Sequence, residues 1–133
     1  MDFIYSKTTK YITVSVTPKY DEESSIPHNG QYVWEYKVKI KNNSSHSIQL
    51  LRRHWIVVDT NGVMQEVEGE GVVGVQPILK PGEYFKYASS VQINSGSGVM
   101  MGSYEMMKEG GETIEVKVPS FSLDSPHVKH SLN

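Results

Sequence analysis

Residues 32–41 read Y-V-W-E-Y-K-V-K-I-K, and this stretch decides the fold class. Apolar or aromatic residues alternate with charged ones at a period of two, the spacing of side chains on opposite faces of a β-strand. One face holds Tyr32, Trp34, Tyr36, Val38 and Ile40, and the other holds Glu35, Lys37, Lys39 and Lys41. The pattern predicts a half-buried strand of an antiparallel sheet.

The same period recurs in three further stretches, whose inward residues are Ile12, Val14 and Val16; Phe85, Tyr87, Val91 and Ile93; and Ile114, Val116 and Val118. Residues 47–60 carry apolar groups on both faces, which favours a central strand covered on both sides, or a bulge near Arg52 and Arg53. Asn61-Gly62 is a strong hairpin signal because both residues tolerate positive φ. Short strands without helical periodicity predict an all-β, two-layer sandwich.

The bulk properties of the 133 residues predict a single domain. We expect a flexible N-terminal arm over residues 1–10, the sandwich over residues 11–124, and a short polar tail over residues 125–133. A net charge of -2 argues against nucleic acid or an anionic membrane as partner, and the absence of cysteine excludes disulfides and thiolate metal sites. Neither a leader pattern nor a long apolar run occurs, which favours a cytoplasmic protein.

A glycine pattern in the middle of the chain invites a nucleotide-binding interpretation. Gly69, Gly71 and Gly74 spell G-x-G-x-x-G, which in dinucleotide-binding folds precedes a helix. Here the following residues are β-branched valines and prolines, which do not begin a helix. The chain between Glu83 and Glu105 also lacks the acidic residue that would contact a ribose. We therefore reject a Rossmann fold.

Two interpretations of the Gly69–Gly74 loop remain. In the first, the peptide N–H groups of the loop converge on a phosphate, and Arg52, Arg53 or Lys80 adds positive charge. In the second, which we favour, the glycines relax φ where the chain leaves a sheet, and Glu68 and Glu70 beside them repel an anion.

Arg53 shares a strand face with Trp55 and is expected near the core. A carboxylate, with Asp59 or Glu66 as candidates, or several carbonyls would then partner its guanidinium in a structural role. The other residues assigned to structure rather than to a ligand are Trp34, Trp55, Tyr104, Pro81 and Gly82.

Catalytic and metal chemistry find no support in the sequence. No serine lies in a G-x-S-x-G elbow, and no histidine can be paired with an acid by spacing. The histidines and the acidic run Asp21–Glu23 do not form a ligand set. We expect no catalytic residue, no metal and no cofactor.

An ordered series of motifs resembles the bacterial ApaG family from about Tyr11 to Asn133. The motifs are R-R-H-W-I-V-V-D at residues 52–59, G-E-G-V-V-G at 69–74, Gln76-Pro77, Pro81-Gly82-Glu83, Phe85-Lys86-Tyr87 and G-V-M-M-G-S-Y at 98–104. Such an ordered series is far more specific than any single motif.

The resemblance implies an immunoglobulin-like or fibronectin type III-like antiparallel β-sandwich. Bacterial members are associated with cobalt and magnesium tolerance, and related eukaryotic domains serve as interaction modules in F-box and polymerase-associated proteins. We therefore expect a non-enzymatic module that binds a protein partner, a second copy of the chain included. The alternative is a phosphate, nucleotide or divalent-ion sensor that uses the Gly69–Gly74 loop, since this glycine pattern has prompted such proposals for the family.

Overall fold

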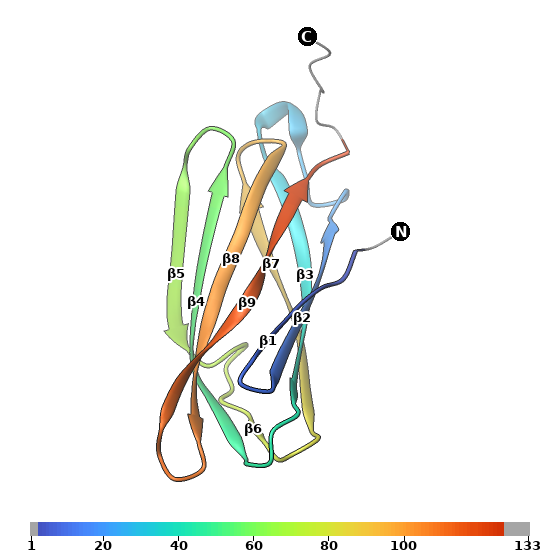
Figure 1. The fold of residues 1–133 in the computed structure, drawn as a ribbon. Helices are drawn as coiled ribbons and strands as arrows, with labels where there is room; N and C mark the ends of the chain where they lie inside the picture. The colour runs from blue at the N-terminus through green and yellow to red at the C-terminus, as the bar shows by residue number, and fades with distance from the viewer. Residues whose placement is uncertain (1–2, 127–133) are drawn as a thin grey trace.

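Two antiparallel β-sheets packed face to face form the protein in a computed structural model that describes residues 3–126 (Figure 1). One sheet has the order β1-β2-β3-β7, with β1 (Tyr5–Thr9), β2 (Ile12–Tyr20), β3 (Tyr32–Asn42) and β7 (Tyr84–Ile93). The other has the order β5-β4-β8-β9, with β4 (Ile48–Asp59), β5 (Met64–Glu70), β8 (Ser97–Lys108), β9 (Thr113–Asp124) and β6 (Ile78–Leu79) on β4. A 3-10 turn, η1 (Pro27–Asn29), precedes β3. The predicted all-β sandwich is confirmed.

The core lies between the sheets and is built from the inward half of each alternating strand. On β3, Trp34, Tyr36, Val38 and Ile40 are buried, whereas the lysines between them are exposed. Trp55 of β4 packs edge-on against Tyr104, with 6.1 Å between ring centroids. Such aromatic pairs add to the stabilisation from burial alone. The period-two pattern of the sequence thus matches the burial pattern of the strands.

Strand β4 is an interior strand of its sheet and carries the bulge expected near Arg52 and Arg53. The alternative of a strand covered on both sides is wrong, because the outer face of β4 is exposed or half-buried. Strand β4 pairs with β5 on one side and β8 on the other, and its register with β8 shifts between Leu50 and Arg52. The Asn61-Gly62 hairpin follows, with Gly62 at φ 80°. The Asp59 side chain accepts hydrogen bonds from the N–H groups of Asn61 and Val63, at 2.9 and 3.0 Å. Pro81 and Gly82 form the turn from β6 to β7, and Gly82 adopts φ 84°.

The flexible arm expected at residues 1–10 is wrong for Tyr5–Thr9, which pair with β2 as the edge strand β1. The Tyr5 ring packs 5.9 Å from that of Phe121, and Ser6 is hydrogen-bonded to Ser15 across the pair. At the C-terminal end of the described residues, Ser125 is buried and its N–H donates to the Gly96 carbonyl at 2.7 Å. The rest of the expected tail, residues 127–133, lies outside the described residues. No helix in residues 3–126 is long and apolar enough to cross a membrane.

Replacing Tyr5 with Ala should lower the free energy of unfolding by about 1–2 kcal/mol, because it removes the ring that anchors β1 to β9. Urea unfolding followed by tryptophan fluorescence measures the change. Ser6→Ala on the exposed face is the control and should change stability by less than about 0.5 kcal/mol. Unchanged stability in the Tyr5 variant would mean that β1 contributes nothing to the fold.

Candidate functional site

The G-x-G-x-x-G segment forms the end of an edge strand and a tight turn. Gly69 lies within β5, and the Gly71 N–H donates to the Leu51 carbonyl at 2.8 Å. Val72 and Val75 exchange two backbone hydrogen bonds of 2.8 and 2.9 Å around Val73 and Gly74, which both have positive φ. That geometry is a type I′ turn. The rejection of a Rossmann unit is confirmed, because no helix follows Gly74.

Arg53 holds this segment from inside. Its Nη1 donates to the carbonyls of Glu70 and Gly71, at 3.1 and 3.0 Å. The guanidinium lies over Gly69 so closely that a Cβ there would be 2.8 Å from Nη1. The partners of Arg53 are therefore backbone carbonyls. This confirms one of the two alternatives expected from the sequence, a carboxylate or several carbonyls.

The carboxylate partners expected for Arg53 are wrong. Asp59 caps the Asn61-Gly62 hairpin instead, and Glu66 Oε2 lies 2.9 Å from His54 Nε2. Alternation explains this outcome, because Glu66 lies on the outer face of the sheet while Arg53 points inward.

The structure leaves few of the loop's N–H groups for an anion. Those of Gly71, Val72 and Val75 donate to protein carbonyls, and a Cβ on Gly71 would lie 2.2 Å from the Val75 oxygen. The three cations assigned to a phosphate do not gather at the loop. Arg52 lies on the exposed face of β4, opposite to Arg53, and Lys80 follows β6 in the turn to β7. This arrangement supports the structural interpretation of the loop, in which its glycines allow the chain to turn out of the sheet.

Three tyrosine side chains from both sheets meet beside Arg53. The Tyr87 and Tyr104 hydroxyls are hydrogen-bonded to each other. Burial raises the pKa of Tyr36, Tyr87 and Tyr104, although the nearby Arg53 charge acts to lower each. These hydroxyls therefore stay protonated and serve as neutral hydrogen-bonding groups. The inward alternation of β3 and β7 in the sequence was the signal for this cluster, but alternation does not reveal which inward residues meet across the core.

The outer face of the first sheet carries a group that we call the lysine face: Lys37, Lys39, Lys41 and Lys86. Lys39 lies directly opposite Lys86 on the neighbouring strand. Both ammonium groups make cation–π contacts with the Tyr84 ring: its centroid lies 4.7 Å from Lys39 Nζ and 5.4 Å from Lys86 Nζ. A shallow hollow of about 570 Å³ lies over this face. Within residues 3–126, no ion pair joins any of these lysines to a carboxylate.

The outer face of the second sheet is acidic. We call the exposed carboxylates Glu66, Glu68, Glu70, Glu105 and Glu115 the glutamate face. Basic groups are interspersed there, since His54 Nε2 lies 2.9 Å from Glu66 and Lys117 Nζ lies 3.7 Å from Glu115. The two sheets thus present opposite charge to their surroundings, which a net charge of -2 conceals.

The remaining histidines and acids do not gather in the part of the chain that the structure describes, residues 3–126, where no group of three or more could hold a metal ion. His28 lies in η1, whereas His46 Nδ1 faces Glu109 Oε2 at 3.9 Å. Asp21 closes a turn: hydrogen bonds from the Ser24 side chain and backbone lower its pKa.

Replacing Arg53 with Met should lower the free energy of unfolding by about 1–2 kcal/mol, because Met keeps the apolar stem but leaves two carbonyls without their donor. Chemical denaturation measures the loss. Arg52→Met is the matched control and should change stability by less than about 0.5 kcal/mol. Equal losses in both variants would refute the structural role of Arg53.

The buried tyrosines predict a loss of stability at alkaline pH. Their folded pKa values are raised, so the unfolded chain ionises first, from about pH 10. The stability that they contribute is complete below this pH and is lost above it, by at most about 1.4 kcal/mol per pH unit for each tyrosine. Tyr104→Phe should make the decline in denaturation midpoint between about pH 9 and pH 11 shallower. Tyr84→Phe on the lysine face is the control, and an identical decline in both variants would contradict the assignment.

Comparisons with known proteins agree with this architecture and with the motif series. The ApaG domain model matches residues 22–108. The chain is 48% identical to Protein ApaG of Paramagnetospirillum magneticum and 47% identical to that of Brucella canis. Both alignments cover 98% of this chain and 100% of the relative. The crystal structure of the ApaA protein from Bordetella pertussis has a TM-score of 0.85 and 45% identity, over 88% of this chain and 95% of that one. The C-terminal domain of wzt has a TM-score of 0.55 and 9% identity, over 98% of this chain and 82% of that one. At this low identity the likeness shows the fold alone. The chain belongs to the ApaG family.

Proposed function

We propose that this ApaG-family chain is a non-catalytic binding module that docks an acidic segment of a partner protein on its lysine face. The observation that carries the proposal is the group of four exposed lysines on one sheet face without a carboxylate partner in residues 3–126. Glu35 lies at one end of the same face of β3, but no acid lies between the four lysines. Surface lysines that serve only solubility are normally interspersed with acids.

The arrangement of the lysines costs the free protein stability. Like charges directly opposite each other on paired strands are destabilising, and Lys39 faces Lys86 in this way. The Tyr84 ring between them offsets part of the repulsion through cation–π contacts. An acidic partner would relieve the rest, so the unbound face is poised to attract negative charge.

A protein segment fits this face better than a nucleic acid does. Nucleic-acid affinity grows with the number of phosphates neutralised, and a patch of four lysines neutralises few. The glutamate face on the opposite side would repel a long polyanion that extended around the domain. A second copy of this chain is one candidate partner, since its own glutamate face is complementary in charge.

The Gly69–Gly74 loop supports the proposal indirectly. Its hydrogen bonds with Arg53 and Leu51 tie β5 to β4, which keeps the sheet edge in place. We do not assign the loop a phosphate, because the N–H groups of Gly71 and Val72, and that of the neighbouring Val75, already donate to protein carbonyls.

Charge reversal at the lysine face tests the proposal. We expect a labelled peptide rich in Asp and Glu to bind at low salt, and the K39E/K86E variant to bind it about tenfold or more weakly because attraction becomes repulsion. Fluorescence anisotropy over a salt series measures both effects. K80E/K117E has the same net charge change at other sites and should retain most of the affinity.

Three results would contradict this function. The first is equal weakening in both double variants, which would show that only net charge matters. The second is a single-stranded DNA of equal charge that binds as tightly as the peptide. The third is peptide binding that does not respond to salt, because a charge-driven contact must weaken as ions screen it.

A further inference from the structure

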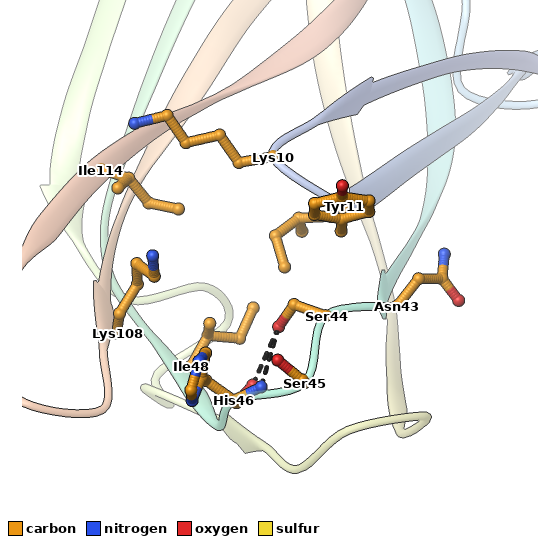
Figure 2. Close-up of a pocket in the computed structure, with 10 residues that line it drawn as sticks. Lys10, Tyr11, Asn43, Ser44, Ser45, His46, Ile48, Lys108 and Ile114 are labelled. Atoms are coloured by element: carbon orange, nitrogen blue, oxygen red, sulfur yellow. Dashed lines mark hydrogen bonds between the residues drawn. The ribbon is translucent and has the colours of Figure 1, made fainter.

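A second concave region lies at the opposite end of the domain from the chain's Asn61-Gly62 hairpin. It is bounded by the β1–β2 turn, the β3–β4 connection and the β8–β9 hairpin, and has a volume of about 690 Å³ (Figure 2). This volume lies within the range of small-molecule sites. We call it the end pocket. None of its lining residues belongs to the lysine face or to the Gly69–Gly74 loop.

The floor of the end pocket is apolar. It is formed by Ile12, Ile48 and Ile114, which are 1%, 2% and 6% exposed and belong to the core. The Tyr11 ring, 71% exposed, lies across the opening from Lys108 (Figure 2). An apolar floor with an aromatic wall suits the body of a small organic molecule.

The rim of the end pocket carries cations. Lys10 and Lys108 extend their ammonium groups on the side of Ile114, and His46 lies at the lower edge (Figure 2). Lys10 takes part in no ion pair within residues 3–126. Lys108 Nζ lies 3.7 Å from Glu112 and His46 Nδ1 lies 3.9 Å from Glu109, both longer than a hydrogen bond and both at the surface. The Lys108 ammonium can therefore turn from Glu112 to an anionic group at little cost.

The polar wall of the pocket is held rigidly from below. The buried Asn42 side chain donates to the His46 and Leu79 carbonyls at 2.8 and 2.9 Å, and accepts from the Ser44 N–H at 2.9 Å. The segment between β3 and β4 is thus fixed without a ligand, and a preformed site loses less entropy when it binds.

The turn that supplies Lys10 and Tyr11 is strained. Both residues have positive φ, 47° and 69°, in a two-residue hairpin turn. Glycine and asparagine are the residues that accept this conformation readily, and a lysine followed by a tyrosine does so at a cost. Such strain is retained where side chains are needed at that place, and these two side chains both line the end pocket.

We propose that the end pocket binds a small organic anion with a ring-sized apolar body, which lies on the isoleucine floor beside Tyr11 while its carboxylate or phosphate contacts Lys10 and Lys108. This site is independent of the lysine face and of the protein partner proposed for it.

Three phenyl compounds probe the site: phenylacetate, phenyl phosphate and the neutral 2-phenylethanol. Amide chemical shifts of the labelled protein should move around Ile12, Ile48 and Ile114, and at least one anion should bind about tenfold more tightly than the alcohol. The tighter of the two anions identifies the head group. The K10N/Y11G double variant relieves the strained turn while removing both side chains. We expect it to melt at a higher temperature than the natural chain and to bind the preferred anion about tenfold more weakly.

Lys80→Asn, outside the end pocket, is the control and should leave anion binding unchanged. The proposal is overturned by unchanged binding in K10N/Y11G, by equal affinity for the alcohol and both anions, or by shifts confined to the Gly69–Gly74 loop. Lack of any binding at millimolar concentrations would also overturn it. A higher melting temperature without a loss of binding would show that the turn is strained for another reason.

Discussion

The packing of the Trp55 indole between the two sheets is the contact on which the rest of the structure depends. Its ring lies 5.3 Å from that of Tyr36 in the first sheet, and 6.1 and 6.3 Å from Tyr104 and Phe121 in its own. Gly102 makes room for it, since a Cβ there would lie 2.9 Å from Trp55 Cε3. Aromatic burial of this kind contributes both apolar area and directional ring contacts. It also fixes which face of β4 points inward.

That orientation distributes the other side chains. With Trp55 inward, Arg53 must also face the interior, where it takes backbone carbonyls, and Arg52 must face outward. The same alternation sends the lysines of β3 and the glutamates of β5 to opposite outer faces of the domain. Because the two sheets pack face to face, each of these charged rows is left on an outer face of the domain. The lysine face and the core both follow from the same period-two pattern.

Much of this could be predicted from residues alone. Alternation at residues 32–41 predicted β3, and Asn61-Gly62 predicted the hairpin that follows β4. The two apolar faces at residues 47–60 predicted a central strand that is covered on both sides or carries a bulge, and the structure shows the bulge. The strand at Tyr5–Thr9 escaped prediction because its sequence is mostly polar and its turn, Lys10-Tyr11, lacks glycine and asparagine. Its pairing depends on β2 and on the Phe121 ring, which is distant in sequence. The carboxylate partner expected for Arg53 failed because charge alone does not show which carbonyls a turn will present.

The sequence by itself determined the fold class and, in the stretches that alternate clearly, the inward or outward direction of each residue, because side-chain direction in a strand follows from parity in the chain. It also determined the family, through an ordered series of motifs. Only the tertiary structure decided which residues meet: the tyrosine cluster beside Arg53, the lysine face of one sheet, and the end pocket with its isoleucine floor. Each of these joins segments that are far apart in the chain, and such encounters are set by sheet order and packing, which local patterns do not encode.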